Sequence, residues 1–140
     1  MITRSKLSGL FNEFFSSEHF LVVGASSDPS KYGNKVLKWY MNNNYPVTAV
    51  NPNEKIVEGL KTIPNLSSFS SNIPPSKISV SIITPPKITK TILEEAAKLG
   101  ITKIWLQPGA ENLDCQTFAV NNNIKLISGG PCVLVDGPKL

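Results

Sequence analysis

The hydrophobic positions of the chain gather in five short, continuous runs that are rich in β-branched residues. The runs are Phe20 to Val23, Val47 to Val50, Val80 to Ile83, Lys103 to Leu106 and Lys125 to Ile127. Apolar runs that do not alternate with polar residues are typical of strands covered on both faces. We therefore expect five buried strands.

Helix-length segments with a period of 3.6 residues separate these runs. Their expected inward-facing residues are, in order, Val36, Leu37, Tyr40 and Met41; Ile88, Ile92, Leu93, Ala96 and Ala97; and, in a weaker pattern over Asn112 to Asn121, Leu113, Thr117 and Val120. The stretch from Glu54 to Pro75 is irregular, and we expect there a turn, a helical turn near Leu66 to Ser70, and a loop at Pro74 and Pro75.

Strands that alternate with helices predict an α/β fold. Right-handed crossovers favour a Rossmann-like, doubly wound, parallel five-stranded sheet with helices on both faces. Ahead of the first strand, residues 1–19 place five apolar side chains on one helical face: Leu7, Leu10, Phe11, Phe14 and Phe15. That pattern favours a helix packed on the domain over a mitochondrial presequence. We expect residues 1–140 to form one domain.

Composition narrows the classes of partner. The 140 residues are 41% hydrophobic, and no apolar run approaches the roughly 20 residues that span a membrane. The net charge of +4 suits an anionic ligand, but the lysines are scattered, so we expect no nucleic-acid surface. Two cysteines, Cys115 and Cys132, give neither a disulfide framework nor metal-ligand spacing.

These features favour a reducing, cytoplasmic setting. The tail Pro138-Lys139-Leu140 differs at one position from the peroxisomal address Ser-Lys-Leu, so the peroxisome stays an alternative, as does the mitochondrion.

The loop after the first expected strand is the strongest candidate for a ligand site. Gly24 follows the strand directly, small residues come next, and a helix begins near Lys31. Helix N-termini bind phosphate through unpaired N–H groups. The candidate residues of this loop are Gly24, Ala25, Ser26, Ser30, Lys31, Tyr32 and Gly33. A structural turn without a ligand is the alternative.

Two departures argue against an NAD fingerprint. Gly24 and Gly33 lie nine positions apart, which is too long for G-x-G-x-x-G. The second strand ends in Val50-Asn51-Pro52, with no acidic residue before Glu54. NAD-binding sheets place an acid at this strand end to hold the ribose 2′-hydroxyl. A neutral tip tolerates a nearby phosphate better, so NAD(P) is disfavoured.

Several motifs in order resemble the CoA-binding domain family, which is related to the nucleotide-binding domain of the succinyl-CoA synthetase α subunit. They are Val22-Val23-Gly24-Ala25-Ser26 with Asp28-Pro29, Tyr45-Pro46-Val47 leading to Val50-Asn51-Pro52, Gly59-Leu60-Lys61, and Trp105-Leu106-Gln107-Pro108-Gly109-Ala110-Glu111. The resemblance runs from about Phe20 to Cys132. Many relatives end the last strand in an Asp-Arg-Cys-like run, whereas this chain has Ser128-Gly129-Gly130-Pro131-Cys132.

The resemblance implies a small stand-alone protein that binds coenzyme A or an acyl-CoA. It implies that Gly24, Ala25 and Ser26 contact the phosphates, with Lys31 or Tyr32 beside them. It further implies an adenosine end near Asn51 and Pro52, and a crevice wall formed by Thr84 and Pro85. The arginine of that run is missing here, so the resemblance implies no arginine contact at this position.

No catalytic constellation is readable. The single histidine, His19, precedes the first strand, Glu111 is a weak candidate for a general base, and Cys132 is expected to be buried and inert. Three hypotheses remain: a CoA-binding module, an NAD(P)-linked oxidoreductase, and an interaction subunit with a vestigial nucleotide site. Each of them is compatible with a homodimer. We expect Gly24→Val to abolish binding without loss of the fold.

Overall fold

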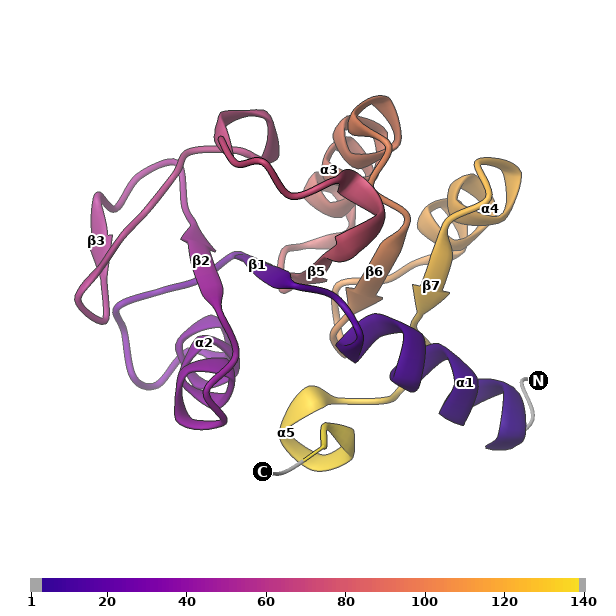
Figure 1. Ribbon diagram of the computed structural model, residues 1–140, viewed down its shortest axis with the longest axis horizontal. Helices are drawn as coiled ribbons and strands as arrows, with labels where there is room; N and C mark the ends of the chain where they lie inside the picture. Colours follow the sequence, from indigo (N-terminus) through magenta and orange to yellow (C-terminus); the bar gives the residue numbers. More distant parts are fainter. Residues whose placement is uncertain (1–3, 139–140) are drawn as a thin grey trace.

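The computed structural model describes residues 4–138 and is built around a five-stranded parallel sheet (Figure 1). The strand order is β2-β1-β5-β6-β7. The strands are β1 (His19–Val23), β2 (Val47–Val50), β5 (Ile78–Ile82), β6 (Lys103–Leu106) and β7 (Lys125–Ile127). The α/β, doubly wound fold with five parallel strands is thus confirmed, and each strand lies within two residues of its expected bounds.

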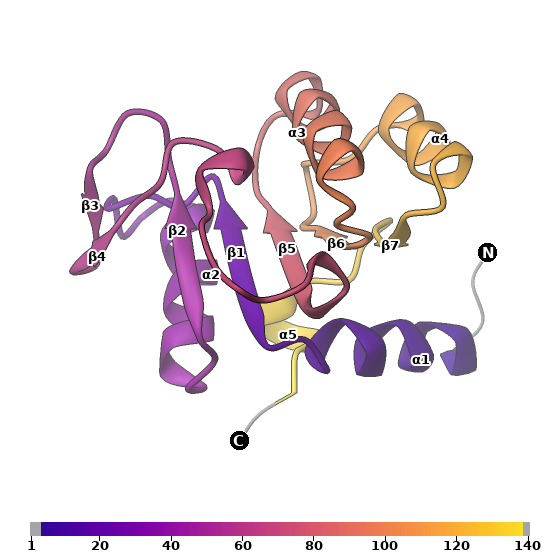
Figure 2. The ribbon, with the colours of Figure 1, turned by 45° about the horizontal axis from the view of Figure 1, so that its top comes forward.

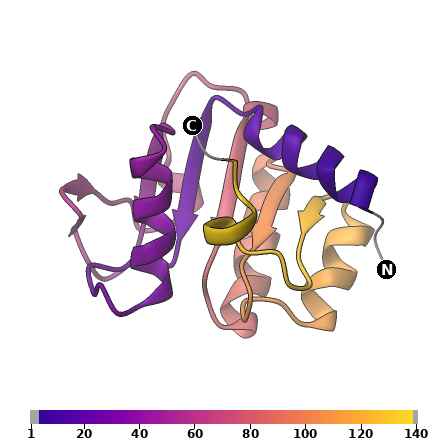
Figure 3. The same cartoon turned by 90° about the horizontal axis from the view of Figure 1, so that it is seen from below.

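Helices cover both faces of this sheet. On one face lie α3 (Pro86–Leu99) and α4 (Leu113–Asn121), side by side in Figure 2. Figure 3 shows the other face, crossed by α1 (Arg4–Phe15), α2 (Tyr32–Asn42) and the short α5 (Val133–Asp136). Of these, α5 was not expected from the sequence. In residues 4–138 no helix is long and apolar enough to cross a membrane.

The core has two layers because neighbouring strand residues point to opposite faces. In β1, Leu21 and Val23 join the cluster beneath α3 and α4, while Phe20 and Val22 join the cluster beneath α1 and α2. In β5 a serine at every second position faces α1 and α2. Ser79 Oγ donates to the carbonyl of Phe14 at 2.6 Å, so this buried hydroxyl is paired.

The expected N-terminal helix is present and packs on the sheet. Its Phe14 is 2% exposed, and its Phe11 ring stacks on Trp105 with centroids 5.0 Å apart. Buried aromatic side chains supply much of the apolar area of a core, so α1 is part of the core of the domain.

Two expected burial patterns are wrong. In α4 the side chains of Leu113 and Val120 are 77% and 76% exposed, whereas Cys115 and Ala119 are buried. This helix lies at the edge of the layer and turns Cys115, Ala119 and the half-buried Phe118 towards the core cluster. In α3 Ile88 is 49% exposed, because it lies at the rim of a hollow described below.

The irregular stretch after β2 forms a small hairpin and two 3₁₀ turns. The hairpin pairs β3 (Ile56–Val57) with β4 (Leu60–Lys61), and the turns are η1 (Leu66–Ser68) and η2 (Pro75–Lys77). The helical turn near Leu66 was expected, and the hairpin replaces the expected turn.

Candidate functional site

The strand order identifies where a ligand would enter the sheet. In the sheet β2 lies on one side of β1, and the next strand of the sheet along the chain, β5, lies on the other side. The strand order therefore reverses its direction at β1. Ligands of open α/β sheets bind at such a switch point, outside the carboxyl ends of the strands. The loops after β1, β2 and β5 meet there, and they are the loops that the sequence predicted.

The loop after β1 is held tightly against its neighbours by glycine. Gly24 has φ of +93°, and its N–H donates to Val50 O at 3.2 Å. A Cβ on Gly24 would overlap the carbonyl oxygen of Ile83, and a Cβ on Gly33 would overlap the carbonyl oxygen of Gly24. Gly24→Val would therefore strain the backbone itself, and the survival of the fold in that variant stays a prediction.

The first turn of α2 is open to an anion. Within residues 4–138, no side chain caps it: Lys31 occupies the N-cap position and makes no capping hydrogen bond. The first N–H groups of a helix have no acceptor within the helix, so without a cap they can donate to a bound anion. Ser26 and Ser30 are partly committed within the loop, because Asp28 N donates to Ser26 Oγ at 3.1 Å and Ser30 Oγ donates to Asp28 at 2.7 Å.

A hollow of about 380 Å³ opens between this loop and the end of β2. It is lined by seven of the predicted site residues: Gly24, Ala25, Ser26, Lys31, Tyr32, Gly33 and Asn51. Asn53, Glu54 and Ile83 complete the lining and were not predicted. Hereafter we call it the first hollow.

Asn51 shapes the turn after β2. Its Nδ2 donates to Ala25 O at 2.8 Å, and its Oδ1 accepts from the N–H groups of Asn53 at 2.7 Å and Glu54 at 2.9 Å. Side-chain bonds to the backbone two residues ahead are the usual chemistry of an Asn turn. The turn brings Glu54 back towards the loop after β1.

Glu54 places a negative charge in the first hollow. Its carboxylate accepts the N–H of Ser27 at 3.2 Å and the Ser27 hydroxyl, and Asn51 Nδ2 donates to it at 3.3 Å. The hydrogen bond from the Ser27 hydroxyl, followed by that from the Ser27 N–H, lowers the pKa of Glu54. The sequence predicted a neutral end of β2, and this prediction is wrong, because Glu54 lies there with its charge. The Asn-Pro-Asn turn sequence was the signal that could have indicated this return.

A second hollow of about 320 Å³ adjoins the first and shares Gly24, Asn51 and Asn53 with it. Its other walls are mostly apolar and include the predicted residues Pro52 and Thr84, together with Val50, Leu66, Ile88 and Ile92. The predicted residues Ser30 and Pro85 line neither hollow. Both hollows lie near the lower end of the size range of ligand pockets, about 300–1,000 Å³.

A family model for the CoA binding domain matches residues 18–138. The chain belongs to the CoA binding domain family. The match confirms the resemblance drawn from the sequence motifs, and it spans all three loops that enclose the two hollows.

Solved structures of other proteins share the fold of this CoA binding domain. A conserved hypothetical protein from Pyrococcus furiosus is 31% identical, with 85% of this chain and 98% of that chain covered and a TM-score of 0.77. A hypothetical protein from Pyrococcus horikoshii OT3 is 24% identical over 91% of this chain and 86% of its own, with a TM-score of 0.80. A protein from Thermus thermophilus is 20% identical over 96% of each chain, with a TM-score of 0.77.

The loop after β7 reaches the first turn of α2 in this CoA binding domain. There Cys132 is half-buried, and its Sγ is hydrogen-bonded to the Tyr32 hydroxyl. Burial, and then this bond, raises the pKa of Tyr32, so the phenol stays neutral. Behind it, Gln107 Oε1 accepts from Val133 N at 2.9 Å, while Gln107 Nε2 is buried with no partner in the described part of the chain.

The remaining candidates for chemistry lie apart from both hollows. Glu111 accepts from the N–H groups of Gly109 at 3.1 Å and Gly129 at 3.4 Å, so it ties the loops after β6 and β7 together. His19 Nε2 is hydrogen-bonded to Thr48 Oγ1 at 2.8 Å, and its ring stacks on Phe69. Burial lowers the pKa of His19.

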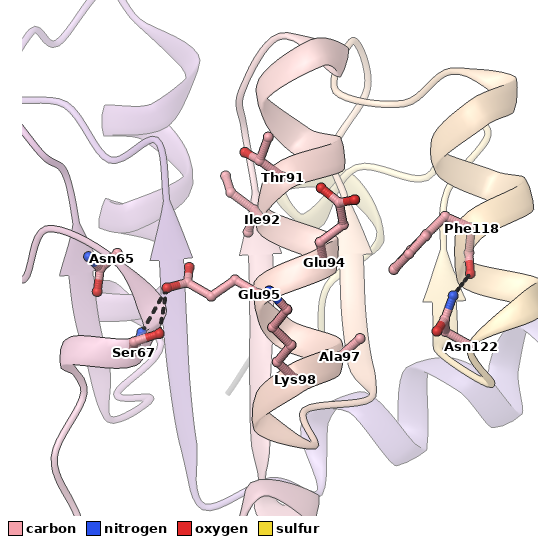
Figure 4. Close-up of a pocket in the computed structure, with 10 residues that line it drawn as sticks. All are labelled: Asn65, Ser67, Thr91, Ile92, Glu94, Glu95, Ala97, Lys98, Phe118 and Asn122. Carbon is pink, nitrogen blue, oxygen red and sulfur yellow. Dashed lines mark hydrogen bonds between the residues drawn. The ribbon is translucent and has the colours of Figure 1, made fainter.

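A wider groove of about 800 Å³ runs along α3 between η1 and α4 (Figure 4). It contains none of the predicted site residues. Glu95 crosses its floor to accept from the N–H groups of Leu66 at 3.2 Å and Ser67 at 3.1 Å, and the Phe118 ring lies towards α3 from the other side (Figure 4). The carboxylate of Glu95 thus holds η1 to α3.

Proposed function

We propose that this chain binds coenzyme A or an acyl-CoA in the crevice formed by the two hollows. The observation that carries the proposal is the first hollow itself, where an uncapped helix N-terminus faces open space at the switch point of the sheet. The family match supports CoA-related binding.

The residues present suit the parts of such a ligand. The backbone at Gly24 to Ser26, the first turn of α2 and the Lys31 ammonium would take the pyrophosphate, because N–H groups and cations favour anions there. The apolar second hollow beside Pro52 and Ile88 would take the adenine ring. Thr84, in the loop between β5 and α3, lines the second hollow and would lie along the path of the ligand.

The proposed activity is binding without a chemical step. The described residues that line the first hollow include neither histidine nor cysteine, and the hydrogen bonds from Ser27 lower the pKa of Glu54, which makes its carboxylate a weak base. An efficient general base has a pKa near the operating pH and lies within reach of the substrate. Glu111, the base considered from the sequence, lines neither hollow.

One observation favours a second candidate, an NAD(P)-linked protein. An acidic side chain near the end of β2 is the residue that holds the ribose hydroxyls of NAD, and Glu54 supplies one. The length of the loop after β1 argues against this candidate, since it departs from the dinucleotide fingerprint.

Calorimetric titration of the purified protein with CoA, dephospho-CoA and NAD separates the candidates. We expect saturable binding of CoA-type nucleotides and weaker or no binding of NAD. Binding of NAD alone would support the second candidate. Failure of all three ligands, together with a tight protein partner in pull-downs, would instead support an interaction subunit with a vestigial site.

A further inference from the structure

The Glu54 carboxylate has room for one more hydrogen-bond donor. Oε2 accepts from Ser27 N and Asn51 Nδ2, at 3.2 and 3.3 Å, and Oε1 accepts from the Ser27 hydroxyl. A carboxylate offers about four acceptor positions, so Oε1 retains one. A ribose 3′-hydroxyl can donate to that position, whereas a fully ionised 3′-phosphate has no proton to donate there.

The charge of the first hollow also matters. Among the described residues that line it, Lys31 carries the positive charge and Glu54 the negative one. Asp28 lies nearby and acts electrostatically on Glu54, and hydrogen bonds from Ser30 lower the pKa of Asp28. The pyrophosphate of the ligand would pair with the Lys31 ammonium. No other described side chain that lines the first hollow is then positively charged and able to neutralise a further phosphate.

The position of Glu54 matches the place of the ribose. When a pyrophosphate lies on the loop after the first strand, the adenosine ribose lies beside the end of the second strand. In dinucleotide-binding sheets an acid at this place accepts the ribose 2′-hydroxyl, and an arginine nearby accommodates a 2′-phosphate. In coenzyme A the 2′-hydroxyl is free and the phosphate stands on the neighbouring 3′ position, so the charge of Glu54 is what acts on that phosphate. Coenzyme A carries a phosphate monoester on its ribose, with a charge between about −1.5 and −2 at neutral pH.

We propose that Glu54 makes the site discriminate against the 3′-phosphate of CoA, so that it binds nucleotides of the dephospho-CoA type, whose ribose carries free hydroxyls, more tightly. This inference rests on the proposed function, namely that the crevice binds the adenosine diphosphate part of a CoA-type ligand. It adds a specificity-determining residue at the one group in which CoA and dephospho-CoA differ.

Parallel titrations of wild type and Glu54→Gln with CoA and dephospho-CoA test this inference. In wild type, dephospho-CoA should bind at least tenfold more tightly than CoA. In Glu54→Gln, CoA should gain at least tenfold while dephospho-CoA changes less than about threefold, because an amide oxygen still accepts the ribose hydroxyl. Glu94→Gln removes the same charge from the exposed surface of α3 and should leave both affinities unchanged.

A second variant covers the possibility that Glu54→Gln fails to fold. Asn53 is exposed and lines both hollows, so Asn53→Lys adds a cation beside the ribose while Glu54 stays in place. It should strengthen CoA binding at least fivefold more than dephospho-CoA binding.

Three results would overturn the inference. CoA that binds wild type as tightly as dephospho-CoA would show that Glu54 does not discriminate. An equal increase in the affinity of both ligands in Glu54→Gln would show that the carboxylate competes with phosphates for Ser27. It would also show that the carboxylate does not distinguish the two ribose groups. If neither nucleotide binds, the proposed function fails and the inference falls with it.

Discussion

Glu54 accepts hydrogen bonds from both the backbone N–H of Ser27, at 3.2 Å, and its hydroxyl, and so joins the turn after β2 to the loop after β1. The two residues are separated by 27 positions in the sequence. Their bond forms because Asn51 turns the chain back between them. The shape and the charge of the first hollow both depend on this contact.

The contact predicts how the stability of the fold depends on pH. The pKa values of Glu54 and Asp28 are lowered from ordinary values of 4.5 and 3.8, chiefly by hydrogen bonds from the Ser27 and Ser30 hydroxyls. A lowered folded-state pKa stabilises the fold above the unfolded value and loses that effect as pH falls through the folded value. The urea concentration at the midpoint of unfolding should therefore decrease as the pH is lowered below about 4.5. In Ser27→Ala this decrease should be smaller. A midpoint that falls equally steeply in Ser27→Ala would contradict the role of the contact.

Gly24 is predicted to be required by the backbone and not only by a ligand. Ala at Gly24 or at Gly109 would face a positive φ, which costs about 1–2 kcal/mol. At Gly24 the new Cβ also overlaps the Ile83 carbonyl, while at Gly109 it meets nothing within 4 Å. Gly24→Ala should therefore lower the free energy of unfolding by about 1–3 kcal/mol more than Gly109→Ala. Urea denaturation measures both, and equal losses would contradict this account.

Asn34 is predicted to support the loop from beneath. It is 1% exposed, and its Nδ2 donates to Ser26 O at 2.9 Å and Glu58 Oε2 at 2.8 Å. Asn34→Ala leaves both acceptors without this donor and should cost about 1–3 kcal/mol of unfolding free energy. Ligand affinity should fall as well, because Ser26 loses the hydrogen bond that holds its backbone in place. The matched variant Asn72→Ala, in an exposed loop, should change neither quantity. A loss in Asn72→Ala as large as in Asn34→Ala would refute the assignment.

The exposed stripe on α4 gives a prediction about self-association. Leu113 and Val120 are more than three-quarters exposed, so replacing both with glutamate should change the unfolding free energy by less than about 0.5 kcal/mol each. The homodimer expected from the sequence stays a prediction. Light scattering on the same double variant tests whether α4 mediates it: a dimeric wild type with a monomeric variant would support this surface, and an unchanged mass would exclude it.

Most of the fold could be predicted because its signals are local. The five strands follow from continuous apolar runs such as that at Val22, and the helix face of Phe14 follows from its spacing. The stripe of α4 could not be predicted, since Leu113 and Val120 have the spacing of a core but lie outside it. Burial there is decided by how close the helix comes to the sheet, which only tertiary packing fixes.

The candidate site was predictable to the same extent. The residues between Gly24 and Gly33 follow one another in sequence, and seven predicted residues line the first hollow. Glu54 was placed outside it because its return depends on side-chain bonds of Asn51, which no periodicity encodes. The cytoplasmic location stays a prediction, and the alternative peroxisomal address involves Lys139 and Leu140, which lie outside the described residues.

The central claim is that the crevice at the switch point binds a CoA-type nucleotide with its pyrophosphate at the first turn of α2. The most direct test is calorimetric titration of CoA into wild type, Lys31→Gln and Lys98→Gln. Lys31 lines the first hollow, while Lys98 lies in the groove along α3, so the two variants lose the same charge at different places. We predict saturable binding to wild type, at least tenfold weaker binding to Lys31→Gln, and an unchanged affinity in Lys98→Gln. No binding to wild type, or equal affinities of all three proteins, would contradict the account.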